Sequence, residues 1–419
     1  MELITLDNGL KIALEFKADA RSAAVCFDIA AGNRFESPAT AGISHFIEHM
    51  VFKGTVTRSS EDIARESDLM GGQLNAFTSK EYTCFYSRAL TEHIGRTLDL
   101  MCDMLCNPLF DSEDIETEKG VVLEEIGMYE DSPEDLCSDI LNALSYNGNS
   151  LGFNILGTRE TVQGFTADCL RKYMAETYTP ERIVVSICGN FDRGEILKIL
   201  DRYFGQKPNS NNALKYNQIV ISGGITLAPR DFEQTVVSFC VNGVDAFHPL
   251  RHALSFYSSI LGGASSSKIN RRIREELGLA YSAYSFSSYY LGAGVFGITA
   301  GLAPKNQKKY FSEVAEIFKI SQTLLCEDEI ERTREQFKVG LVLANESLSS
   351  IAASAAKQLL LKGEYYDLDA DLKKLRAVTL NDVKEAARLV NNFETVALSA
   401  VGKTESEDFY RSMLEKFKM

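Results

Sequence analysis

The stretch His45-Phe46-Ile47-Glu48-His49 places two imidazoles four residues apart, with a carboxylate directly before the second. On an α-helix, residues i and i+4 lie on the same face, about one turn apart. Two neutral imidazoles on one face can bind a single Zn²⁺ ion, each at about 2.0–2.1 Å. Glu48 projects toward the same side and is placed to act as a general base on a metal-activated water. The order H-x-x-E-H is the inverzincin signature and predicts a zinc-binding helix.

A third protein ligand is best sought in the acidic segment 111–130, which reads DSEDIETEKGVVLEEIGMYE. Glu118 and Glu125 are seven residues apart and share a helical face, whereas Glu124 is turned about 100° away from Glu125. Apolar residues within 121–126 indicate partial burial, and a buried carboxylate needs a partner because an unpaired charge is costly there. The alternative is a solvated acidic face, which is the ordinary interpretation of a charge run.

The composition is that of an ordinary globular protein, with 419 residues, 45% hydrophobic and 24% charged. This length is enough for two or three domains. The formal net charge of −14 argues against nucleic acid as the main partner, because phosphate binding needs a basic surface. No run approaches 18 apolar residues and the N-terminus reads as a hairpin, so we expect no membrane partner and no signal peptide. The nine scattered cysteines predict free thiols in a reducing cytoplasm.

The second large feature is an internal repeat with an offset of 212 to 215 residues. Residues 24–29 resemble 236–241, and residues 182–189 resemble 395–402. Helices group between strand pairs, which favours α+β layers over a doubly wound sheet. Strands are expected at 3–15, 23–31, 73–88 and 182–190, and helices at 40–53, 59–70, 91–106, 111–130, 133–146 and 165–178. The expected bounds are 1–206 for an N-terminal zinc-binding domain, 207–217 for a polar linker and 218–419 for a C-terminal repeat domain without H-x-x-E-H.

The chain resembles the M16 peptidases, the family of pitrilysin, insulin-degrading enzyme and mitochondrial processing peptidase. Residues 45–55, HFIEHMVFKGT, are similar to that family's active-site helix throughout, and the resemblance to its bacterial M16B-type members covers essentially the whole chain. It implies two homologous LuxS/MPP-like metallohydrolase domains of α+β class that face each other as a clamshell. The C-terminal domain would be inactive but would contribute substrate-binding residues.

The resemblance also implies roles for individual residues of the metal centre. His45, His49 and Glu125 would bind one Zn²⁺ ion per chain. Glu48 would be the catalytic base, and Glu118, one heptad before Glu125, would support catalysis. Helical spacing alone leaves open whether Glu118 or Glu125 binds the metal, and the resemblance assigns that role to Glu125.

Substrate contacts are implied in both halves. Arg274 and Tyr281 have the spacing of a family pair that reaches across to substrate at the zinc, where both can hydrogen-bond a peptide carbonyl or an oxyanion. The alternative for this pair is a basic surface helix running into a strand. Asn75, Ala76 and Phe77 match a strand along which a peptide adds as an extra β-strand, although they also suit an ordinary core strand.

Three further residues are candidates for substrate binding. Phe52, one turn after His49, matches an aromatic that shapes the pocket beyond the scissile bond, or is a core residue. Asp135 and Asp139 are four residues apart, so one arginine of a substrate could meet both. The alternative for these acids is a solvated helical face.

These observations predict a zinc endopeptidase that cleaves peptides or unfolded segments in an enclosed chamber. A rival hypothesis is a non-catalytic scaffold subunit, and a third is an active subunit that needs a hetero-partner. The presence of three ligands, the base and the Arg–Tyr pair favours catalysis. We expect a cytoplasmic protein that acts on peptides as a homodimer or monomer.

Overall fold

The computed structural model describes residues 1–211 and 214–418, and the chain divides into two compact units. Unit 1 comprises Met1–Ile126, Phe153–Lys215 and Val342–Leu368, and unit 2 comprises Gly127–Gly152, Tyr216–Leu341 and Asp369–Met419. Residues 212 and 213, which fall in the predicted linker 207–217, lie outside the described residues.

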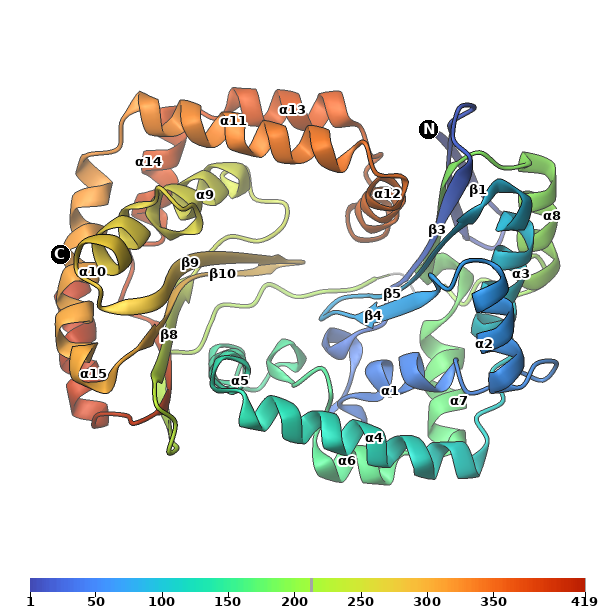
Figure 1. The fold of residues 1–419 in the computed structure, drawn as a ribbon, viewed down its shortest axis with the longest axis horizontal. Coiled ribbons are helices and arrows are strands. Elements are labelled where there is room, and N and C mark those ends of the chain that lie inside the picture. Colours follow the sequence, from blue (N-terminus) through green and yellow to red (C-terminus); the bar gives the residue numbers. More distant parts are fainter. Residues whose placement is uncertain (212–213, 419) are drawn as a thin grey trace. The chain divides into compact units, whose positions relative to one another are not determined.

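Unit 1 is built on a six-stranded sheet with the order β1-β2-β6-β3-β5-β4. Figure 1 labels β1, β3, β4 and β5 of this sheet. Its strands are β1 (Glu2–Thr5), β2 (Lys11–Phe16), β3 (Ser22–Ile29), β4 (Asn75–Thr78), β5 (Thr83–Leu90) and β6 (Ile183–Gly189). β2 and β6 run parallel, and the other neighbours are antiparallel. β3 is buried on both faces, which explains why its sequence is a nearly continuous apolar run.

Helices cover both faces of this sheet. The helices of this unit are α1 (Ile43–Met50), α2 (Ser60–Leu69), α3 (Ile94–Cys106), α4 (Ser112–Asp131, which continues into unit 2), α6 (Arg159–Gly164), α7 (Ala167–Thr177), α8 (Arg193–Phe204) and α12 (Leu348–Lys362). The face toward Val25 and Phe27 of β3 packs in the main core with α1, α3, α7 and α8, whereas the opposite face, with Ala24, is covered by α12. The two faces thus belong to two separate apolar clusters.

Unit 2 repeats the plan with a five-stranded sheet of order β7-β11-β8-β10-β9. Its strands are β7 (Gly224–Pro229), β8 (Thr235–Asn242), β9 (Ala280–Tyr290), β10 (Ala293–Leu302) and β11 (Val396–Gly402). Its helices are α5 (Pro133–Ser145), α9 (Arg251–Ser258), α10 (Gln307–Thr323), α11 (Glu327–Ala344, which ends in unit 1), α13 (Leu368–Ala377), α14 (Leu380–Leu389) and α15 (Glu407–Leu414). β7 and β11 run parallel, as β2 and β6 do, and the remaining order matches β6-β3-β5-β4. The repeated α+β plan predicted from the sequence is therefore confirmed.

The two repeats exchange one helix each. α5 comes from the first half of the sequence but packs on β8 and β11 of unit 2, and α12 comes from the second half but packs on β3 and β6 of unit 1. α12 begins 215 residues after α5, so the exchange follows the repeat. The contiguous bounds 1–206 and 218–419 therefore differ from the compact units. The physical reason is that each sheet has a second apolar face, which the exchanged helix covers with small and aliphatic side chains.

Among the described residues, no single helix combines the length and hydropathy of a membrane span. α11 and α12 pass that test only as a pair, and they meet at a bend of 106°. The apolar side chains of α12 are buried against the sheet of unit 1.

Candidate metal centre

The three predicted metal ligands lie together in unit 1. His45 and His49 project from α1 with ring centroids 4.5 Å apart, and Glu125 projects from α4. The Nε2 atoms of His45 and His49 lie 3.7 and 3.8 Å from the same oxygen, Glu125 Oε2. Donors around a tetrahedral zinc ion with bonds near 2.0–2.1 Å stand about 3.3–3.4 Å apart. The donor set and its spacing therefore fit Zn²⁺ after a contraction of a few tenths of an ångström.

A buried carboxylate fixes the start of the ligand-bearing helix. Glu36 accepts hydrogen bonds from the backbone N–H groups of Gly42, at 2.8 Å, and Ser44, at 3.0 Å. Gly42 has a φ of 89°, and a Cβ there would come within 2.5 Å of the Leu156 carbonyl oxygen, so this turn requires glycine. Burial raises the pKa of Glu36 to about 7. The sequence interpretation missed this residue, although a carboxylate shortly before a helix start is a capping signal.

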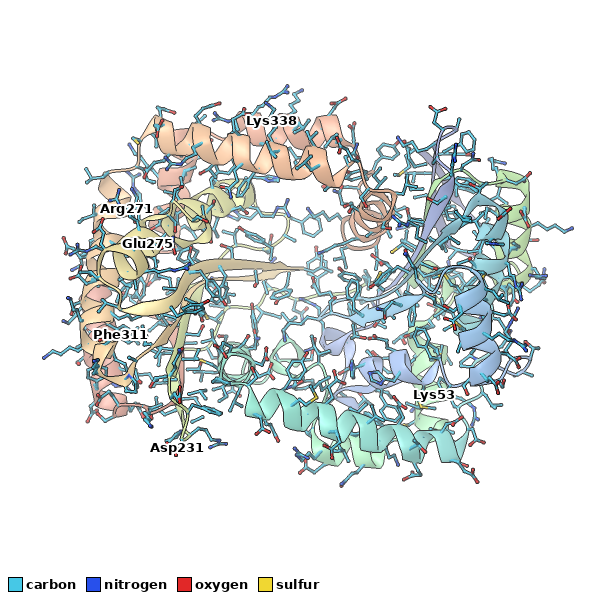
Figure 2. All side chains as sticks on the ribbon, viewed as in Figure 1. Lys53, Asp231, Arg271, Glu275, Phe311 and Lys338 are labelled. Atoms are coloured by element: carbon cyan, nitrogen blue, oxygen red, sulfur yellow. The ribbon has the colours of Figure 1, made fainter. Side chains whose placement is uncertain are left out.

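Glu118 contacts His49, one of the predicted metal ligands, on the side of the ring away from Glu125. Its Oε1 lies 2.7 Å from His49 Nδ1, and its Oε2 lies 2.5 Å from Lys53 Nζ, just beyond the end of α1 (Figure 2). When His49 Nδ1 carries the ring proton, it donates a hydrogen bond to Glu118. The Nε2 atom of His49 is then unprotonated, and its lone pair points toward Glu125. Burial opposes the ionised form of Glu118, but its hydrogen bonds with His49 and Lys53 lower its pKa overall. The arrangement therefore orients His49 for metal binding.

The two imidazoles differ in their electrostatic environment. Burial, with a smaller contribution from His49, lowers the pKa of His45 to about 3, so this ring is neutral and ready to bind a cation. Burial also acts against the charged form of His49, but the carboxylates of Glu118, Glu125 and Glu48 outweigh it and raise the pKa of His49. His45 Nδ1 is buried and has no hydrogen-bond partner among the described residues. The two imidazoles are thus held in different ways, His49 through Glu118 and His45 through packing.

Glu48 lies on α1 beside the donor set and is held by a threonine. Thr78 Oγ1 donates a hydrogen bond of 2.5 Å to Glu48 Oε2. Burial raises the pKa of Glu48, and the hydrogen bond from Thr78 partly offsets that rise. Thr78 belongs to β4, which lies 30 residues further along the chain than Glu48. Sequence reasoning missed this contact because nothing in the local spacing links the helix with that strand.

β4 is an edge strand in the described part of the chain, paired on one side with β5. Asn75 and Phe77 are exposed, whereas Ala76 packs partly against the main core. The ring of Phe77 lies beside those of Tyr82 and Tyr86. The open edge of β4 therefore presents backbone groups and an aromatic cluster next to the strand position that carries Thr78.

The other predicted substrate residues divide between the two units. Phe52 of unit 1 is partly buried against the main core. Arg274, in the π-helical turn Asn270–Glu276, and Tyr281, at the start of β9, belong to unit 2. The Arg274 guanidinium lies 5.7 Å from the centroid of the Tyr281 ring, which is 78% exposed. Asp135 and Asp139 lie on α5, also in unit 2, so the substrate roles of these four residues stay predictions.

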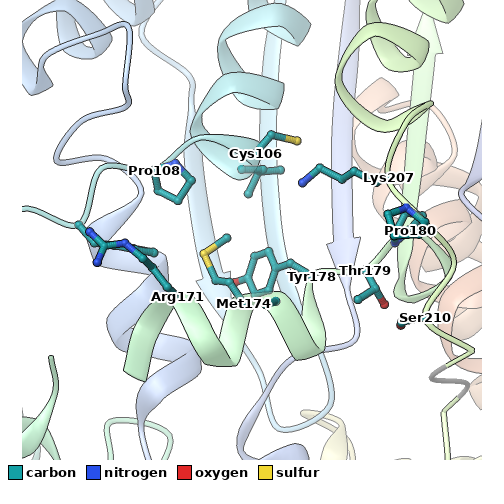
Figure 3. Close-up of a pocket in the computed structure, with 13 residues that line it drawn as sticks. Cys106, Pro108, Arg171, Met174, Tyr178, Thr179, Pro180, Lys207 and Ser210 are labelled. Carbon is teal, nitrogen blue, oxygen red and sulfur yellow. The ribbon is translucent and has the colours of Figure 1, made fainter. Parts of the chain in front are cut away.

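A separate cavity of about 360 Å³ opens in unit 1 between the end of α3 and α7 (Figure 3). Cys106 and Lys207 line it on one side, and Met174 and Tyr178 line it on the other. Its lining, within the described residues, includes none of the three metal donors. Burial raises the pKa of the Cys106 thiol to about 11, which makes this cysteine a weak nucleophile. The cavity is therefore not part of the metal centre.

Comparisons with known proteins identify the family of this chain. The family described as Insulinase (Peptidase family M16) matches residues 11–159, and the Peptidase M16 inactive domain matches residues 164–337. The "Uncharacterized zinc protease YmxG" of Bacillus subtilis is 38% identical over 386 residues, which cover 92% of this chain and 94% of that protein. A protein described as an uncharacterized zinc protease of Streptomyces coelicolor is 34% identical over 97% of this chain and 90% of its own length. The chain belongs to peptidase family M16.

A solved structure shares the fold. The crystal structure of a protease from Helicobacter pylori superposes with a TM-score of 0.87 at 19% identity, covering 96% of this chain and 99% of that one. At this identity the likeness concerns the fold alone. It agrees with the doubled α+β plan that the two sheets show.

Proposed function

We propose that this chain is a zinc-dependent endopeptidase of the H-x-x-E-H type that cleaves peptides or unfolded segments. The observation that carries the proposal is the convergence of His45, His49 and Glu125, with Glu48 beside them. One catalytic zinc ion per chain would be held by these three side chains. The names of the Bacillus and Streptomyces relatives as zinc proteases support both the metal and the reaction.

The chain's own residues divide the chemistry between them. When bound, zinc supplies a Lewis acid that lowers the pKa of water toward about 7 and polarises a carbonyl. Glu48 takes the proton from the attacking water and later delivers it to the leaving amine. Burial raises the pKa of Glu48 and so brings it closer to neutral pH, where a base that must also act as an acid is most effective. Glu118 keeps His49 in the tautomer that leaves Nε2 free.

The edge of β4 provides a means of holding a peptide without reading its sequence. An extended substrate can add to this edge through backbone hydrogen bonds, with Asn75 and Ala76 contributing main-chain groups and Phe77 an apolar contact. The same strand carries Thr78, whose hydroxyl holds Glu48. β4 would then both bind the peptide along its edge and orient the catalytic base Glu48.

The remaining parts of the proposal extend beyond unit 1. Arg274 and Tyr281 are expected to contact the bound peptide, and Asp135 and Asp139 to bind a basic side chain. Enclosure in a chamber would exclude folded proteins. The cytoplasmic location and the homodimer are kept as predictions, and the mass of the purified chain tests the latter.

The first test is direct cleavage by the purified protein alone. We expect it to cut unstructured peptides, to lose activity with a chelator and to regain it when Zn²⁺ is added. Mass spectrometry of the products from a peptide library, with and without chelator, measures both the cleavage sites and the metal dependence. A tightly folded small protein serves as the control and should stay intact. A zinc-loaded, correctly folded preparation without turnover would favour the scaffold or hetero-partner hypothesis.

Thr78→Val removes the hydroxyl that holds Glu48 and preserves the shape of the side chain. We expect kcat to fall about tenfold, equivalent to about 1.4 kcal/mol, because a charged hydrogen bond that orients the base is lost. KM and zinc content should change little. Thr78→Ser restores a hydroxyl and should recover most of the rate. Equal kcat values for the Val variant and the wild type would contradict the positioning role.

A further inference from the structure

Three side chains that can bind a metal ion meet in unit 1 on the sheet face opposite α1. Cys26 and Asp28 lie two residues apart on β3 and therefore share a face, and Cys84 on β5 is the register partner of Asp28. Cys26, Asp28 and Cys84 are 1%, 1% and 2% exposed. They lie on the face that α12 covers. The reaction proposed for the H-x-x-E-H centre uses none of them.

The distances within this group are short. The Sγ atoms of Cys26 and Cys84 are 3.3 Å apart, and Cys26 Sγ lies 3.3 Å from Asp28 Oδ1. One donor atom from each of the three residues lies within 4.8 Å of the other two. Two thiolates and one carboxylate are a ligand set that suits a thiophilic divalent cation.

The group is poorly satisfied as it stands. A carboxylate in an apolar environment needs strong partners, yet within residues 1–211 and 214–418 the hydrogen bonds to Asp28 come from thiols, which are weak donors. Lys357 of α12 is exposed, and its ammonium lies 5.4 Å from the centroid of the Tyr82 ring. Lys357 acts on Asp28 through its charge alone. A buried acid with such weak partners indicates a missing counter-charge.

We propose that Cys26, Asp28 and Cys84 form a second metal site, with three protein donors, that binds a thiophilic divalent cation such as Zn²⁺. Thiolates bound to tetrahedral zinc at about 2.3 Å stand about 3.8 Å apart, so the two sulfurs would separate by roughly half an ångström. Binding releases the two thiol protons, and any proton on Asp28, to solvent. The three anionic ligands leave one net negative charge with the cation, which Lys357 is placed to offset.

The alternative to metal binding for two cysteines at this distance is a disulfide bond. It would require an oxidant, from which burial shields Cys26 and Cys84. Cation binding also needs both thiols deprotonated, but it needs no oxidant. The metal site is therefore the outcome that this environment favours.

The test is a count of metal together with a spectroscopic signature. Elemental analysis of the purified full chain should give two zinc ions for the wild type and one for Cys26→Ser or Asp28→Asn. Replacement of zinc by Co²⁺ should give thiolate-to-cobalt charge-transfer absorption, which a site made of His45, His49 and Glu125 cannot produce. His49→Ala should keep this absorption, so the result is independent of the proposed peptidase centre.

The matched control is Cys188→Ser, because Cys188 is a fully buried thiol of β6 in the same apolar cluster. It should retain two zinc ions and the cobalt spectrum. A wild-type protein with one metal ion and no charge-transfer absorption overturns the proposal, as does a wild type whose intact mass shows a disulfide between Cys26 and Cys84. The wild-type spectrum decides the matter even if a cysteine variant fails to fold.

Discussion

Glu48→Gln is expected to abolish peptide hydrolysis while zinc stays bound. Glu48 lies outside the donor set of His45, His49 and Glu125, so its replacement leaves the metal ligands in place. The amide cannot accept the proton of the attacking water, and loss of a positioned base costs about 10²–10⁴ in rate. Steady-state kcat/KM on an unstructured peptide, measured beside the zinc content of the same sample, tests both parts of the expectation.

The shape of the glutamine variant makes this test selective. The side chain has the same length as glutamate and keeps an oxygen that can accept the hydrogen bond from Thr78 Oγ1. Glu48→Asp serves as the partner variant, because it keeps a carboxylate but withdraws it by one methylene and should retain more activity than the glutamine. Turnover at the wild-type rate in Glu48→Gln would refute the assignment of the base.

Glu125→Ala should release the metal, and with it the activity. Its Oε2 lies 3.7 and 3.8 Å from the Nε2 atoms of His45 and His49, so its removal leaves two of the three proposed ligands. Loss of a residue that merely supports a ligand costs about 10–100-fold in zinc affinity, and loss of a ligand should cost at least about 100-fold. Competition with a chelator measures the zinc dissociation constant, and activity at saturating zinc shows whether any function survives.

The chain supplies a closely matched control in the preceding residue. Glu124 lies on the same helix, is exposed, and is turned away from the donors by one helical step. Glu124→Ala removes the same charge with the same change in helix propensity, so it should leave zinc binding and peptidase activity near the wild type. Equal zinc affinities in the two variants would mean that Glu125 is not a ligand.

Much of the candidate site could be predicted because it depends on local periodicity. The i, i+4 spacing places His45 and His49 on one side of α1, with Glu48 adjacent, wherever that helix packs. The acidic segment forms a single helix, α4, with Glu118 and Glu125 on the same face. Alternating and apolar runs indicated the strands, and the repeat indicated two sheets of one plan. Helix ends differed by a few residues, as for α1, which the structure begins at Ile43 rather than residue 40.

Contacts between distant segments could not be predicted in this way. Helical spacing placed Glu118 and Glu125 on one face but left open which of them meets the Nε2 atoms, and the packing of α4 on α1 decided this. The hydrogen bond from Thr78 to Glu48 likewise arises only where β4 comes beside α1. Neither contact produces a periodic pattern in the sequence from which it could be predicted.

What the amino-acid order by itself determined is the set of local elements and the chemical groups they carry, because backbone geometry fixes which neighbours share a face. Tertiary structure alone decided that α5 and α12 change places between the repeats and that Cys26, Asp28 and Cys84 meet beneath α12. The reason is that an amphipathic helix specifies an apolar face but not the sheet that covers it. That choice depends on long-range packing across the whole chain.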